Sequence, residues 1–174
     1  KPGALADPDA FYENLEKNVK KGSPDKAFLW PQAITEKTEG SFGYIMDLRP
    51  DEYRELTDIL VSSGGGGFST FKAIVEAGIR IVSAFRSLYK IGYSYQDMNS
   101  GNFFINPKTG AVLICDNDNV APNETYTGII GTPQYMAPEI VIGESKPNTH
   151  TDEFSLAVVL FMLLCANHPL EGKH

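Results

Sequence analysis

Residues 93–104 read YSYQDMNSGNFF, and they place Asp97 and Asn102 five positions apart, between a long helical pattern and an apolar pair. Polar residues at such a point cap turns in many proteins, so this spacing alone also fits an ordinary polar turn. The residues that follow along the chain decide between a turn and a catalytic loop.

Two short apolar runs follow, at 102–105 and 111–115, with a turn-rich connector between them. We expect a small antiparallel hairpin, which returns its two ends to the same edge. Asp97 comes just before the first strand and Asp116 just after the second, so both carboxylates can converge with Asn102. Such oxygen ligands suit a magnesium ion that keeps part of its water shell and takes phosphate oxygens as its other ligands. The sequence therefore predicts a metal–phosphate site.

The first part of the chain predicts one helix beside two strands. Apolar residues recur at four-residue spacing over 8–21, after an Asp-Pro-Asp start and before a Gly-Ser-Pro stop, which is typical of an amphipathic helix. The apolar runs 27–31 and 43–48 flank the polar turn TEKTEGS. We expect these two runs to pair as antiparallel strands.

The second part, from 49 to 174, is mainly helical apart from the hairpin. Its expected helices cover 51–60, 69–89, 138–142 and the run that opens at Thr151-Asp152. That last run, FSLAVVLFMLLCA, is apolar nearly all round, which is typical of a helix buried on all sides. The four glycines at 64–67 predict a flexible linker. The fold class is therefore α+β.

Composition narrows the possible partners. Fifteen basic against twenty-two acidic side chains leave a net charge of −7, without the basic excess of a nucleic-acid binder. The longest apolar run is shorter than the roughly 20 residues that span a bilayer. We therefore expect a cytoplasmic protein with neither nucleic acid nor membrane as a partner. The exposed edge of the strand pair at 27–48 could support oligomerisation or strand exchange.

The downstream motifs turn the Asp-Asn spacing into a family resemblance. Five features follow one another along the chain: D-x-x-x-x-N, a hairpin, D-x-x, GTPQYMAPE at 131–139, and D-x-x-S-L-A at the head of an apolar helix. This order resembles the C-lobe of the eukaryotic-like protein kinases, and we expect a divergent serine/threonine type of bacterial origin. The resemblance implies a kinase-like fold, with a partial N-lobe over 1–48 and a mainly helical partial C-lobe over 49–174.

The same resemblance implies ATP and Mg2+ as cofactors and a protein hydroxyl as acceptor. Asp97 would act on the proton of that hydroxyl, and Asn102 and Asp116 would hold the metal. Asp152 would brace the catalytic loop from the apolar helix. Residues 131–139 would form the peptide-binding end of the activation segment.

Further positions would serve the nucleotide. Met46 falls at the gatekeeper position, and the backbone of Asp47 and Arg49 would form the hinge that hydrogen-bonds adenine. Phe104 would lie under the adenine ring. Glu16, on the helix at 8–21, would be the glutamate that pairs with the family's strand-3 lysine.

Departures from the family pattern keep other functions open. Tyr95-Gln96 replaces His-Arg, Asn99 replaces a lysine that often contacts the transferring phosphate, and Asn117-Asp118 replaces Phe-Gly. The sequence contains no G-x-G-x-x-G loop and no A-x-K lysine, so we expect the chain as given to be a fragment that is catalytically incomplete. The alternatives are a pseudokinase or scaffold that binds without phosphotransfer, and a kinase acting on a small-molecule hydroxyl.

Overall fold

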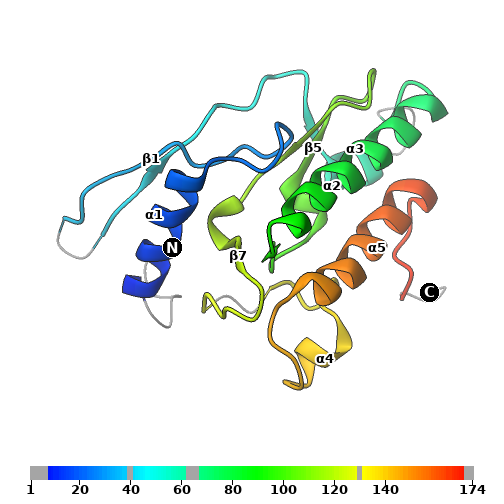
Figure 1. Cartoon of the computed structure of the whole chain (residues 1–174). Helices are drawn as coiled ribbons and strands as arrows, with labels where there is room; N and C mark the ends of the chain where they lie inside the picture. The colour runs from blue at the N-terminus through cyan, green and yellow to red at the C-terminus, as the bar shows by residue number, and fades with distance from the viewer. Residues whose placement is uncertain (1–7, 39–40, 62–66, 129–130, 171–174) are drawn as a thin grey trace.

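The structure, a computed structural model, describes residues 8–38, 41–61, 67–128 and 131–170 (Figure 1). The helices are α1 (Pro8–Lys21), α2 (Leu56–Val61), α3 (Phe71–Lys90), α4 (Pro138–Val141) and α5 (Thr149–Cys165). The strands are β1 (Ala33–Ile34), β2 (Tyr44–Ile45), β3 (Arg54–Glu55), β4 (Tyr93–Ser94), β5 (Phe103–Ile105), β6 (Val112–Ile114) and β7 (Ala121–Pro122). Two 3-10 turns, η1 (Ser100–Asn102) and η2 (Asn117–Asn119), follow β4 and β6. The α+β class is confirmed.

The predicted helices over 8–21, 69–89 and 138–142 are confirmed as α1, α3 and α4. The helix predicted over 51–60 is shorter, because the residues just before α2 pair as β3 with β5 instead of entering the helix. Of the predicted glycine linker at 64–67, only Gly67 lies among the described residues.

The predicted pairing of 27–31 with 43–48 is wrong in its first strand. Strand β2 pairs antiparallel with β1, which lies beyond residue 31. The run at 27–31 instead borders β6, where the Leu29 N–H donates to the Ile114 carbonyl at 2.8 Å and the Ile114 N–H donates to the Ala27 carbonyl at 2.7 Å. Burial explains this choice, because the aromatic side chains of this run belong to the main hydrophobic core.

The predicted hairpin is confirmed as β5 and β6, which pair antiparallel with Phe103 opposite Ile114. Strand β3 adds to the other edge of β5, giving a three-stranded sheet in the order β3-β5-β6. The hairpin therefore brings its two flanking segments, one with Asp97 and the other with Asp116, to the same edge of the sheet.

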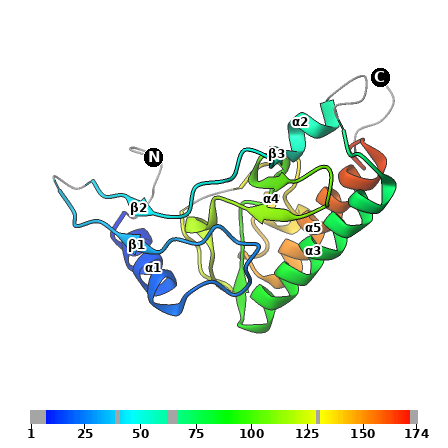
Figure 2. The ribbon, with the colours of Figure 1, turned by 90° about the horizontal axis from the view of Figure 1, so that it is seen from above.

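The core lies between this sheet and two long helices. Figures 1 and 2 show α3 and α5 side by side, with α1 and the β1–β2 pair on the other side of the molecule. Phe85 of α3 is fully buried, and its ring lies 5.5–6.1 Å from those of Phe28, Tyr95 and Phe103. Burying one such ring contributes about 2 kcal/mol. This core includes residues on both sides of position 48.

The prediction that the apolar helix is buried on all sides is wrong. One face of α5 packs on α3, while Phe161 is 41% and Leu164 is 54% exposed. Among the described residues, α3 and its neighbours cover only one side of this helix, so the opposite apolar stripe faces solvent. None of the helices in the described ranges has the length and apolar character needed to cross a membrane.

Candidate active site

The loop between β4 and η1 brings the predicted aspartate and asparagine together. The Asp97 backbone N–H donates to the Tyr95 carbonyl at 3.0 Å, which folds the loop tightly. The Asn102 amide donates to the Asp97 backbone carbonyl at 2.9 Å. The Asp97 carboxylate accepts a hydrogen bond from the Thr132 hydroxyl at 3.0 Å. The polar turn is therefore held in one shape, with the carboxylate facing the segment that begins at residue 131.

The 3-10 turn η1 is tied to the rest of the molecule by hydroxyl groups. Asn99 caps the turn, because its side-chain oxygen accepts from the Gly101 N–H at 3.0 Å. The Ser100 hydroxyl lies 2.8 Å from the hydroxyls of both Thr57 and Tyr135. Because α2 and the segment before α4 both contact η1 in this way, Asn102 has a fixed position at the head of β5.

Asp116 follows β6 at the same edge. The Cys115 N–H donates to the Asn102 carbonyl at 2.9 Å. Asp116 is the next residue along the chain after this contact. Asp116 adopts a left-handed backbone, with φ 54° and ψ 43°, and stands at the N-cap of η2. For a residue other than glycine this conformation is uncommon and marks a constrained turn.

The negative charge of Asp116 affects the pKa values of two tyrosines. Burial is the main reason that the pKa values of Tyr44 and Tyr95 lie above the ordinary value, and the charge of Asp116 raises both further. The same charge adds to burial in raising the pKa of Cys115 to about 11, against the opposing effect of Arg49. Tyr44, Tyr95 and Cys115 are therefore held in their neutral forms beside Asp116.

The donor set fits magnesium better than a transition metal. No group of three or more His, Cys, Asp or Glu residues in the described ranges could hold a metal ion by itself. One carboxylate and one amide oxygen would leave several coordination positions for water and phosphate oxygens, as Mg2+ prefers. Asn102 and Asp116 are the residues that would hold it.

Asp152 braces the loop from α5, as predicted. Its carboxylate accepts hydrogen bonds from the backbone N–H groups of Tyr95 and Gln96. Asp152 itself is buried, with only 3% of its surface exposed. Burial raises the pKa of Asp152 to about 7, while these two hydrogen bonds act in the opposite direction. The brace is thus made by a carboxylate that titrates near neutral pH.

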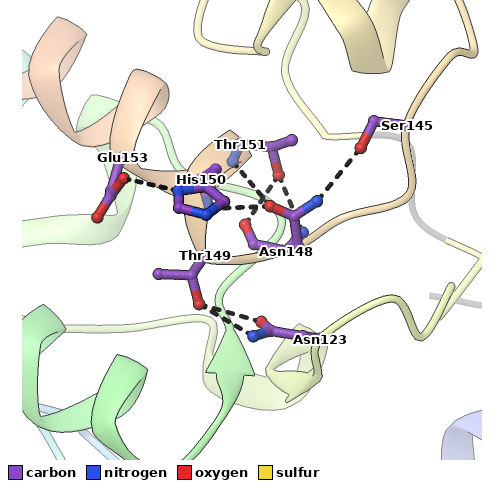
Figure 3. A network of polar contacts seen from close by, with 7 residues as sticks. All are labelled: Asn123, Ser145, Asn148, Thr149, His150, Thr151 and Glu153. Carbon is purple, nitrogen blue, oxygen red and sulfur yellow. Dashed lines mark hydrogen bonds and ion pairs between the residues drawn. The ribbon is translucent and has the colours of Figure 1, made fainter.

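A capping network fixes the helix start that carries this aspartate (Figure 3). The Asn148 side chain accepts from the N–H groups of His150 at 2.8 Å and Thr151 at 3.2 Å, and the Thr151 hydroxyl accepts from the Asn148 N–H at 3.0 Å. Such a reciprocal capping box satisfies helix donors that would otherwise lack partners. Thr149 and Asn123 join the helix start to the end of β7.

Gln96 contacts the segment that contains Thr125 and Thr127. Its backbone φ is 73°. Its amide donates to the Thr125 carbonyl at 2.9 Å and accepts from the Thr127 hydroxyl at 3.2 Å. The segment is therefore held here by neutral hydrogen bonds, without a charged group at this position.

On the predicted nucleotide side, the structure brings two of the four hinge and adenine residues together. The Arg49 guanidinium lies 4.7 Å from the centre of the Phe104 ring, and it also donates to the Tyr53 carbonyl. Met46 and Asp47 lie at the exposed surface just after β2.

Glu16 forms an exposed ion pair with Lys20 of the same helix, at 3.4 Å. The buried face of α1 carries Asn14 and Asn18 instead. Sequence reasoning missed both asparagines, although they share a helical stripe with the apolar residues of the same face. The signal that could have revealed them was the presence of two amide side chains on the apolar face of this helix.

Comparison with known proteins decides the family. A family model described as Protein kinase domain matches residues 41–174, which is more than half of the chain. The chain belongs to the protein kinase family. The match includes the loop with Asp97, the turn with Asp116 and the whole of α5.

Individual kinases resemble the chain at moderate identity. A protein kinase C delta type homolog of Drosophila melanogaster is 30% identical over 97% of this chain. Calcium-dependent protein kinase 20 of Oryza sativa is 32% identical over 66% of the chain, and the SNF-related serine/threonine-protein kinase of Rattus norvegicus is 30% identical over 53%. The chain spans 25%, 21% and 13% of these relatives. The relatives are eukaryotic, and the expected bacterial origin stays a prediction.

Proposed function

We propose that the protein is a serine/threonine kinase that transfers the γ-phosphoryl group of ATP to a protein hydroxyl. The single observation that supports this most is the meeting of Asp97, Asn102 and Asp116 at one edge of the hairpin. A relative whose name contains serine/threonine-protein kinase supports the acceptor class.

In this proposal, Asp97 orients the acceptor hydroxyl and takes its proton as the hydroxyl oxygen bonds to the γ-phosphorus and the bond from that phosphorus to the ADP leaving group breaks. Its carboxylate is available at the loop surface, where Thr132 already donates a hydrogen bond to it. Asn102 and Asp116 would hold the metal. Bound Mg-ATP supplies the electrophilic phosphoryl group and neutralises the developing charge, and the protein contributes mainly positioning.

A protein acceptor is favoured over a small molecule by the segment at 131–139. This segment includes Thr132, whose hydroxyl donates to the Asp97 carboxylate at 3.0 Å, so a peptide docked along the segment would pass close to that carboxylate. Tyr135 of the same segment is buried and bonded to Ser100. The peptide-binding end would therefore be anchored directly to the loop that carries Asp97.

Several finer expectations belong to the same proposal. The N-lobe would comprise 1–48 and the C-lobe 49–174, with the hinge at Met46, Asp47 and Arg49. Phe104 would lie under adenine, and Glu16 would have to leave its surface ion pair to meet a lysine. We place the protein in the cytoplasm, and we expect the chain as given to be catalytically incomplete, so phosphotransfer, nucleotide binding and metal binding are to be measured on the full-length protein.

Substituting Asp97 tests the proposal. With ATP, Mg2+ and a protein acceptor, Asp97→Asn should lower phosphotransfer by about 100- to 10,000-fold, because general-base catalysis contributes that much. Glu36→Gln, which removes an exposed carboxylate in the turn after β1, should leave the rate unchanged. Equal rates in wild type and Asp97→Asn would contradict the assignment. Nucleotide binding without turnover in the wild type would instead favour the pseudokinase or scaffold function. The replacements at 96, 99 and 117 motivate this alternative.

A further inference from the structure

The turn directly after Asp116 is unusually polar for a buried segment. Asn117 is 1% exposed, and Asn119 is fully buried in the same 3-10 turn. Buried amides are costly unless they are hydrogen-bonded. The contacts of this turn therefore indicate what its side chains do.

Helix α1 reaches the end of this turn with two amides. The side-chain NH2 groups of Asn14 and Asn18 both donate to the Val120 carbonyl, at 2.9 and 2.6 Å. Asn18 has no exposed surface, and its own backbone carbonyl accepts from the Trp30 indole N–H at 2.9 Å. The helix, the run at 27–31 and the turn are thus joined through one buried set of hydrogen bonds.

Asn117 makes a second connection. Its NH2 group donates to the Leu29 carbonyl at 2.9 Å and to the Ile114 carbonyl at 2.9 Å. These carbonyls belong to the run at 27–31 and to the end of β6. One amide therefore ties together three chain segments immediately beside Asp116.

Strand β2 makes a third connection, because the Tyr44 side chain is hydrogen-bonded to Asp118. The turn at 117–120 thus receives partners from α1, from the run at 27–31 and from β2. Apolar side chains in the same place could slide over one another, whereas directional hydrogen bonds to fixed carbonyls define one arrangement.

We infer that Asn14, Asn18 and Asn117 are positioning residues for Asp116, and that they lock α1 and the run at 27–31 onto the metal-holding turn. The lock keeps Asp116 in its left-handed conformation and so sets the direction of its carboxylate. This inference rests on the proposed function for the metal role of Asp116. The lock itself follows from the contacts alone.

A matched pair of substitutions tests the lock. Asn117→Leu and Asn119→Leu make the same change two residues apart at buried sites. The Asn119 side chain, unlike that of Asn117, has no hydrogen-bond partner among the described residues. Mn2+ binding in the presence of ADP, followed by electron paramagnetic resonance, should weaken about tenfold or more in Asn117→Leu, as for other residues that orient metal ligands. It should stay unchanged in Asn119→Leu.

Hydrogen exchange separates positioning from general destabilisation. In Asn117→Leu, backbone amides at 116–121 should exchange faster, while those of α3 and α5 keep the wild-type rates. Equal behaviour of the two variants, or faster exchange throughout α3 and α5 with unchanged Mn2+ affinity, would overturn the inference. Should Asn117→Leu fail to fold, Asn18→Leu carries the same test, because Asn14 still donates to Val120.

The two proposals fail in different ways. If the wild type bound no Mn2+ with ADP, the kinase function would be contradicted, and the exchange rates at 116–121 would still report on the lock. If the wild type bound Mn2+ and Asn117→Leu bound it equally well, the positioning role would be rejected while the proposed function stood.

Discussion

Asp152 combines two opposing effects in a single side chain. Burial favours its neutral form, and the N–H groups of Tyr95 and Gln96 favour its ionised form. Burial dominates, so the pKa rises to about 7. The charges of Asp152 and Glu153 add to burial in raising the pKa of Tyr89. The residue that supports the loop is therefore sensitive to pH.

This sensitivity predicts a pH-dependent stability. Between about pH 4 and 7 the folded protein retains the Asp152 proton that the unfolded chain releases, so ionisation lowers the free energy of unfolding as pH rises through this window. Compared with Asp152→Asn, the wild type should lose on the order of 1 kcal/mol or more between pH 5 and pH 8. Urea unfolding of both proteins at the two pH values measures this. An identical difference at both would show that Asp152 does not titrate in the window.

Residues of the site differ in how far the sequence could predict them. Asp97, Asn102, Asp116 and Asp152 stand in local motifs, and the structure brings the first three to one edge and places Asp152 beneath the loop. The roles of the α1 asparagines could not be predicted, because the carbonyl that Asn18 contacts lies 102 positions away in the sequence. Local patterns do not contain such a partner.

At the scale of elements, the β5–β6 hairpin depends on its close approach to α3. Gly110 has φ +68°, and a Cβ added there would lie 2.3 Å from the Ala73 carbonyl oxygen. Since that oxygen belongs to the helix backbone, the contact could be relieved only by moving the hairpin. Gly92 has a similar φ of +74°, with nothing within 4 Å of an added Cβ.

The two glycines therefore provide a matched prediction. Gly92→Ala should cost about 1–2 kcal/mol, the usual penalty for a left-handed backbone at a residue with a Cβ. Gly110→Ala should cost clearly more, on the order of 4 kcal/mol, because the clash adds to the same penalty. Chemical denaturation of both variants gives the comparison. Equal losses would mean that the hairpin does not rest on α3 as closely as described.

Long elements were easier to predict than short ones. The periodicity of α1 and α3 extends over several turns, so their boundaries are within two residues of expectation. Strands β1 and β2 contain two residues each, and no pattern of that length specifies a partner. The run at 27–31 borders β6 because Phe28 and Trp30 enter the core, which is a tertiary effect.

At the scale of the whole molecule, one hydrophobic core joins residues on both sides of position 48. Phe28 and Trp30 belong to the same cluster as Phe85 and Phe103. The polar lock at 117–120 joins the same two parts beside the site. Among the described residues, an apolar stripe of α5 is exposed, and the expected oligomerisation or strand exchange stays a prediction.

The central claim is that Asp116 holds a metal that binds together with the nucleotide. Isothermal titration of ATP into the wild type and Asp116→Asn, with and without Mg2+, tests this most directly. We predict that Mg2+ strengthens ATP binding in the wild type, and that Asp116→Asn weakens the Mg2+-dependent binding by about tenfold or more. ATP binding that is independent of Mg2+, or equal in the two proteins, would contradict the account.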